Sequence, residues 1–321
     1  MVERAPLRPR APGPGAVALG GGVIALAIGV SLTGWSGGRE LARLDPLWSL
    51  CLAARPGVVP TDLWSSWSLA PQIVLPLLLA VLLYARGARA GRPTPLRTAC
   101  FAAGMLLLAA ALVSPLCRLA ASLASAHMIQ HVLIVAAVPP LLIVSGALAT
   151  RRQGLPATAR RSAGSVAQWL GRPALASVLY AVAIWLSHTP AVYEAALLEP
   201  AIHLLLLAFQ LGAGLLFWQV LLRPVATREA RSNGRIGGAL LMAFSTFMHT
   251  GLLGALLTFA SAPWYSIYEL RPQAWGLTAL EDQQLAGVIM WVPMSALYLT
   301  AGLALMARLL EVRAPGPTPQ L

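Results

Sequence analysis

The chain has 321 residues, of which 58% are hydrophobic and 11% charged, and its mean hydropathy is +0.72. Soluble domains carry about 25% charged residues, so this composition excludes a large soluble core and predicts an all-α, polytopic membrane helical bundle. The net charge of +12 results from 23 arginines, without any lysine, and 11 acidic residues. Because these arginines lie in short segments between apolar stretches, they indicate membrane orientation rather than nucleic-acid binding.

Eight apolar stretches are long enough to cross a bilayer, for which about 20 residues suffice. In chain order the predicted spans are Ala16–Trp35, Ser68–Ala85, Arg97 to Pro115 or Cys117, Ala126–Ala149, Pro173–Val192, Pro200–Leu222, Ile236–Ala260 and residues 283–307. The first is read as an uncleaved helix, since no clear small-x-small cleavage site follows it. The fourth is expected to kink at Pro139-Pro140, because proline removes a helix hydrogen bond.

The predicted organisation has four parts: a basic cytoplasmic tail (1–15), the first span with a long outer loop (16–67), a seven-helix membrane core (68–310) and a disordered cytoplasmic tail (311–321). The tryptophans of the outer loop suggest a short interfacial helix there. With the N-terminus inside, the inner segments carry 18 arginines and the outer segments 5. The positive-inside rule therefore predicts eight spans with both termini in the cytoplasm.

All five histidines lie within these spans or at their ends: His127, His131, His188, His203 and His249. The first two are four residues apart, which places both imidazoles on one helix face. On the predicted topology the first four lie near the outer side, and the fifth lies about 16 Å deeper than the end of its span. Imidazole binds copper, zinc, iron or nickel, and ionisable groups inside a membrane indicate function. For each histidine a hydrogen bond to a neighbouring helix stays open as the alternative.

Methionines accompany two of these histidines. Met128 adjoins His127, Met248 adjoins His249, and Met242 lies seven residues before His249 on the same face. Thioether ligands select Cu(I), although methionine is also an ordinary filler of apolar cores.

Cys117, at the outer end of the third span, is a candidate thiolate ligand of the same kind. Cys51 is predicted on the same side, so the sequence also allows a Cys51–Cys117 disulfide, while Cys100 is placed toward the inner side.

Polar residues precede the last span at its outer mouth. Thr278 stands three residues before Glu281, which is the spacing of a capping box for the last helix. Asp282 and Gln283 follow and are expected to rim the entrance to the histidines. There they would attract a cation or hold a histidine tautomer as a hydrogen-bond partner.

Four motifs occur in this order: SAHMIQH followed by PPLLIVSG, then WLSHTPAVYEAAL, FMHTGLLGALLTFA and LEDQQLAGVIMWVP. Together they resemble the CtaG family of cytochrome c oxidase assembly factors, the membrane-integral type, over roughly residues 65–310. The resemblance implies a multi-pass protein of the bacterial inner membrane that supports assembly of haem–copper cytochrome c oxidase at the copper step. It identifies the five histidines with the membrane histidines of the family, whose members often carry another histidine where this chain has Leu207.

The resulting hypothesis is a copper-binding metal chaperone that holds Cu(I), with oxidase subunits, other copper chaperones and the lipid bilayer as partners and no nucleic acid. No ATPase motif and no nucleophile–base pair is present, so no catalysis is expected. Three alternatives stay open. A copper permease needs a polar path inward, and below His249 the seventh span offers only Ser245, Thr246 and Met242. A haem-binding electron carrier would use histidines of facing helices, and a scaffold for the oxidase would bind no metal.

Overall fold

The computed structural model describes residues 49–53, 57–147, 172–226 and 233–313. Within these ranges the chain is helical and forms no strand, as the composition predicts. Six helical runs are long and apolar enough to cross a membrane, and one bent helix pair makes a seventh. They are α2 (Pro71–Gly91), α3 (Pro95–Leu112), the run α5 (Ala124–Val132), η3 (Leu133–Ala137) and α6 (Val138–Val144), the bent pair α9 (Pro173–His188) and α10 (Pro190–Leu198), α11 (Pro200–Ala226), α12 (Asn233–Thr258) and α13 (Ala279–Arg313).

These seven coincide with the second to eighth predicted spans. The first, Ala16–Trp35, lies outside the described residues. The total of eight spans and the N-in, C-in orientation therefore stay predictions.

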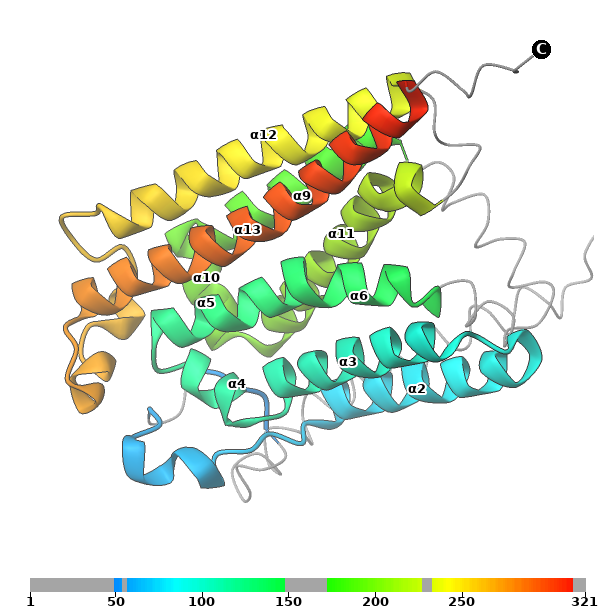
Figure 1. Ribbon diagram of the computed structural model, residues 1–321. Helices are drawn as coiled ribbons and strands as arrows, with labels where there is room; N and C mark the ends of the chain where they lie inside the picture. The colour runs from blue at the N-terminus through cyan, green and yellow to red at the C-terminus, as the bar shows by residue number, and fades with distance from the viewer. Residues whose placement is uncertain (1–48, 54–56, 148–171, 227–232, 314–321) are drawn as a thin grey trace, which may run out of the picture.

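The run α5–η3–α6 passes through the middle of the bundle (Figure 1). It packs against α13 on one side and α3 on the other, while α11 lies against η3 and α6. α12 and α13 form a long hairpin, and α2 packs along α3 at the edge. The short elements gather at one end of the bundle, which we call the cap end (Figure 1). They are η2 (Pro60–Ser65), α4 (Pro115–Ala120), α10, η4 (Ser266–Tyr268) and η5 (Arg271–Trp275).

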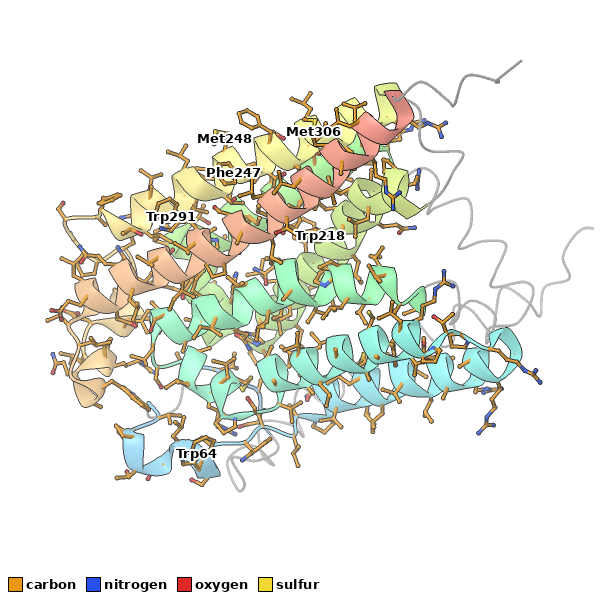
Figure 2. All side chains as sticks on the ribbon, viewed as in Figure 1. Trp64, Trp218, Phe247, Met248, Trp291 and Met306 are labelled. Carbon is orange, nitrogen blue, oxygen red and sulfur yellow. A yellow bond between two sulfur atoms is a disulfide. The ribbon has the colours of Figure 1, made fainter. Side chains whose placement is uncertain are left out.

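Glycines let α12 and α13 approach closely. A Cβ atom added at Gly287 would lie 2.6 Å from the Thr258 amide nitrogen, and one added at Gly254 would lie 2.5 Å from the Trp291 Cβ. Real Cβ atoms do not come so near to other heavy atoms, so both positions need glycine. The outward faces of the hairpin are apolar, and Figure 2 shows Met248 and Met306 on them, 46% and 44% exposed.

The fifth predicted span, Pro173–Val192, is wrong at its end. The helix stops at His188 and bends by 76° into the separate helix α10. Pro190 explains the break, because it has no backbone N–H and pushes the preceding residue out of the helical region. Thr189 accordingly has extended backbone angles of φ −67° and ψ 129°.

The third predicted span also ends early. α3 stops at Leu112, and Ser114 starts the separate helix α4 by accepting a hydrogen bond from the Leu116 amide at 3.2 Å. A serine before a proline at the first helical position is a strong start signal.

The two prolines of the fourth span disturb the helix one turn earlier than their own position. Leu133–Ala137 forms a π-helical stretch, a rare element that occurs mostly as a single turn inside an α-helix. The carbonyl of Val135 would bond residue 139 in an α-helix or residue 140 in a π-helix, and both are prolines without an N–H. Tyr180 and Trp218 donate to this oxygen instead, at 3.0 and 3.2 Å.

Candidate functional site

Four of the five histidines gather near the cap end and form what we call the histidine cluster. His127 and His131 lie on α5, His188 ends α9, and His203 lies in the first turn of α11. All four are buried, with at most 7% of each residue exposed. The ring centroids of His127 and His131 are 4.5 Å apart, and those of His131 and His188 are 5.3 Å apart. His203 and His188 both lie within electrostatic range of the α5 pair.

A hydrogen bond joins the two imidazoles of α5. Their Nε2 atoms lie 2.8 Å apart, whereas two nitrogens on one tetrahedral ion with bonds of 2.0–2.1 Å lie about 3.3 Å apart. Within the described ranges, no three His, Cys, Asp or Glu side chains are already spaced to hold a metal ion together. An ion held by both of these Nε2 atoms has to replace the His127–His131 hydrogen bond.

Backbone carbonyls fix the tautomers of the other two members. His188 Nδ1 lies 2.6 Å from the Ile184 oxygen, and His203 Nδ1 lies 3.1 Å from the Ala196 oxygen. A carbonyl only accepts, so each Nδ1 carries the proton and each Nε2 keeps a lone pair in the neutral ring. Metal-binding histidines have this arrangement, with one nitrogen donating to a carbonyl and the other facing the ion.

Two imidazole nitrogens of the cluster have no hydrogen-bond partner although both are buried. They are His188 Nε2 and His127 Nδ1. An unsatisfied buried polar atom costs about 1–3 kcal/mol, so each of these nitrogens favours a ligand that binds to it.

Gln210 belongs to the site and was missed by sequence reasoning. Its Nε2 lies 3.3 Å from His131 Nδ1 and 3.4 Å from His131 Nε2, and the side chain is buried. Gln210 lies seven residues after His203, on the same face of α11, so this spacing was the available signal. Leu207, one turn after His203, packs against the apolar core.

Asp282 is fully buried and binds the start of the histidine-bearing helix. Its carboxylate accepts hydrogen bonds from the Ala124 amide at 2.6 Å, the Ser125 amide at 3.1 Å and the Ser125 hydroxyl. α5 has no cap from its own N-cap residue Leu123, so a side chain of α13 supplies the cap. Asp282 therefore contacts the backbone that positions His127 rather than an imidazole.

The neighbours of Asp282 have separate roles. Glu281 and Thr278 form the predicted capping box: the Glu281 carboxylate accepts from the Thr278 amide and hydroxyl, both at 2.8 Å, and the Thr278 hydroxyl accepts from the Glu281 amide at 3.2 Å. Gln283 accepts from the Trp264 amide at 2.6 Å through Oε1. Its Nε2 is buried without a partner.

Three tyrosines cover the cluster at the cap end, and sequence reasoning missed all three. The Tyr193 ring contacts the His127 ring in a tilted arrangement, with centroids 4.6 Å apart, and stacks on Tyr265 with centroids 3.9 Å apart. Tyr265 donates to the His188 carbonyl at 3.0 Å, and Tyr268 donates to the Ala120 carbonyl at 2.7 Å. Burial raises the pKa of the Tyr265 and Tyr268 phenols, so both hydroxyls stay protonated and able to donate.

His249 lies apart from the cluster. It is half-buried on α12, and its Nδ1 accepts from Trp185 Nε1 at 3.3 Å. In the described part of the chain no ring contact or hydrogen bond joins it to the other histidines. Met248 is exposed on the outward face of α12 (Figure 2), while Met128 and Met242 are buried in the apolar core.

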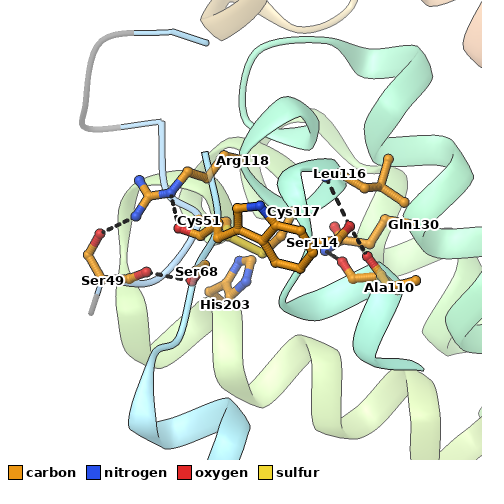
Figure 3. The surroundings of a disulfide bond; sticks show 12 residues. Ser49, Cys51, Ser68, Ala110, Ser114, Leu116, Cys117, Arg118, Gln130 and His203 are labelled. Atoms are coloured by element: carbon orange, nitrogen blue, oxygen red, sulfur yellow. Dashed lines mark hydrogen bonds between the residues drawn. A yellow bond between two sulfur atoms is a disulfide. The ribbon is translucent and has the colours of Figure 1, made fainter. Parts of the chain in front are cut away.

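Cys117 is bonded to Cys51, with the two Cα atoms 5.6 Å apart (Figure 3). Of the two alternatives that the sequence left open, the disulfide is formed, so Cys117 offers no thiolate in this state of the protein. Cys100 on α3 is free and partly buried.

The chain matches the model of a known protein family. The family described as cytochrome c oxidase caa3 assembly factor (Caa3_CtaG) matches residues 77–311, a range that includes the histidine cluster, Gln210 and Asp282. Searches among curated proteins and among solved structures found no match. The family match confirms the resemblance of the four sequence motifs and covers well over half of the chain. This multi-pass helical membrane protein therefore belongs to the cytochrome c oxidase caa3 assembly factor family.

Proposed function

We propose that this chain binds copper as Cu(I) in the histidine cluster and hands it on during assembly of the copper centre of cytochrome c oxidase. The family supports a role in oxidase assembly. The observation that carries the copper part is the pair of buried imidazole nitrogens without partners, His188 Nε2 and His127 Nδ1.

Ring positions support a shared ion between α5 and α9. Two imidazoles on one ion have centroids about 5–6 Å apart, given metal–nitrogen bonds of about 2.0–2.1 Å. The His131 and His188 centroids are 5.3 Å apart. The hydrogen bond from His188 Nδ1 to the Ile184 carbonyl directs its free lone pair away from the helix backbone, so little rearrangement is needed on that side.

Charge balance favours a singly charged cation. The imidazoles are neutral donors, and Asp282 is the one fully buried carboxylate among the described residues. Its carboxylate lies at the first turn of the helix that carries His127. Cu(I) together with this carboxylate leaves no net buried charge, whereas a divalent ion leaves a net positive charge in a medium where isolated charges are costly.

The test is the copper content of the full-length protein purified in detergent with the Cys51–Cys117 disulfide intact. Wild type is compared with His188→Ala and with the matched control His249→Ala, which removes a membrane histidine outside the cluster. We expect about one Cu(I) per chain in wild type and in the control. His188→Ala should lower the affinity for Cu(I) about tenfold or more, because losing a ligand costs at least as much affinity as losing a hydrogen-bond partner of a ligand, which costs about 10–100-fold.

Equal copper binding by wild type and His188→Ala would overturn the proposal, as would a wild-type protein that binds none. Thermal unfolding of each variant checks that the fold is kept. Oxidase activity of cells that carry each variant then connects the loss of copper to assembly.

A further inference from the structure

The cysteine pair lies beside the one member of the histidine cluster that makes no ring contact with the others. Figure 3 shows the His203 imidazole next to the Cys51 and Cys117 sulfur atoms. Both cysteines are buried, 2% and 4% exposed, and His203 is 6% exposed.

Adjacent carbonyls of α10 hold these groups together. The Ala196 oxygen accepts from His203 Nδ1 at 3.1 Å, and the next oxygen, of Leu197, accepts from the Ala53 amide at 2.8 Å. The short segment that carries Cys51 is therefore fixed to the same turn of chain as the imidazole. His203 Nε2 keeps its lone pair, because Nδ1 carries the proton.

We propose that Cys51 and Cys117 form a redox-active pair whose dithiol form binds one soft metal ion, Cu(I), together with His203 Nε2. In the reducing step a partner dithiol attacks the Cys51–Cys117 bond. The partner becomes a disulfide, and its two electrons and two protons appear as two thiols on this chain. In the binding step the two thiols release their protons and become ligands of Cu(I). Thiolates select Cu(I) over hard cations, and sulfurs joined to each other offer no thiolate.

Arg118 supplies a positive charge that balances the net negative charge of the proposed site. Two thiolates and one Cu(I) carry a net charge of −1, which a buried site does not tolerate without a counter-charge. Arg118 follows Cys117 in the chain, and Figure 3 shows it beside the disulfide. Its Nη2 donates to the Ser49 hydroxyl at 3.0 Å and its Nε donates to the Trp67 carbonyl at 3.1 Å, so the guanidinium is held in place.

The test can separate this inference from the proposed function, because the cysteine site needs no ion at His127, His131 or His188. The two sites also differ in their dependence on redox state, since only the cysteine site requires a reductant. A triple variant His127→Ala, His131→Ala, His188→Ala therefore separates them.

The test counts Cu(I) ions per chain in full-length, detergent-purified protein. One sample keeps its disulfide, and the other is reduced with a small phosphine that is then removed under argon. Cu(I) is measured by competition with a coloured chelator, and thiols are titrated in parallel. We expect one more Cu(I) per chain in the reduced sample, accompanied by a near-ultraviolet thiolate–Cu(I) absorption.

Variants assign the additional ion. It is lost in Cys117→Ser and kept in the matched control Cys100→Ser, which removes the free cysteine of α3. It persists in the triple histidine variant. In His203→Ala the thiol count is unchanged, and the affinity for the additional ion falls about tenfold or more.

Equal Cu(I) binding in both redox states would overturn the proposal, as would an additional ion that survives in Cys117→Ser or is unaffected by His203→Ala. A pair that stays oxidised in the folded protein under the phosphine would overturn it as well. Circular dichroism of the reduced wild type distinguishes these results from unfolding.

Discussion

The carbonyl of Val135 shows how a single residue is satisfied in the middle of an apolar bundle. No backbone N–H is available to it, because residues 139 and 140 are both prolines. Tyr180 of α9 and Trp218 of α11 donate to it, and Tyr180 also shares a hydrogen bond of 2.8 Å with Tyr298 of α13. A sequence predicts the kink but not these partners, which lie 45 and 83 residues away along the chain.

We expect Tyr180→Phe to lower the free energy of unfolding by about 1–3 kcal/mol, since Tyr298 loses its hydroxyl partner and Val135 keeps one donor. Thermal unfolding in detergent measures the change. Tyr84→Phe is the matched control, because the buried Tyr84 hydroxyl has no hydrogen-bond partner and its removal costs nothing. Equal destabilisation by both substitutions would contradict the prediction.

Two helices depend on each other through one carboxylate. α5 begins without a cap of its own, and Asp282 of α13 accepts from the amides of Ala124 and Ser125. α13 is in turn capped at its start by Thr278 and Glu281. The first turn of the histidine-bearing helix is therefore held by an element that begins more than 150 residues later.

Asp282→Asn should loosen this first turn, because an amide presents N–H groups where the carboxylate accepted hydrogen bonds. The expected cost is about 1–2 kcal/mol, the range of a lost N-terminal cap. Hydrogen exchange of a peptide covering residues 124–132 should become faster. Glu281→Gln keeps a capping group on the exposed side and should leave this peptide unchanged; unchanged exchange in Asp282→Asn would refute the role of Asp282.

At the scale of the whole molecule, the placement of arginines distinguishes the two ends of the bundle. Arg86, Arg89 and Arg97 flank the turn between α2 and α3, at the end opposite to the cap end, as Figure 1 shows for that turn. Arg118 and Arg271 lie at the cap end, where Arg271 donates to the carbonyls of Ala121 and Ala53. The positive-inside rule then predicts that the cap end faces outward.

Reporter fusions test this orientation. Green fluorescent protein joined after Leu321 should fluoresce, and alkaline phosphatase at the same site should be inactive, because the C-terminus is predicted inside. A fusion after Trp275, in the segment between α12 and α13, should give the opposite pair of signals. Phosphatase activity of the Leu321 fusion would show that the bundle has the opposite orientation.

Hydropathy predicted the seven described spans because the length and apolarity of a bilayer-crossing helix are local properties. The meeting of helix faces is not local. His249 and His188 had similar support in the sequence, yet the structure places His249 against Trp185 and His188 in the cluster. Close packing of α12 on α13 through Gly254 and Gly287 fixes how α12 is rotated, and an amphipathic pattern does not encode this where every face is apolar.

The Cys51–Cys117 bond also closes a covalent ring, since the two cysteines are 66 residues apart and α2 and α3 lie between them. α2 is the least buried of the described spans, since 11% of its apolar stretch is buried within the protein, and it packs along α3. A ring of this size removes about 4 kcal/mol of chain entropy from the unfolded state. The attachment of this edge hairpin thus depends on a covalent tether where side-chain packing is sparse, and opening the tether would loosen the edge of the bundle before its centre.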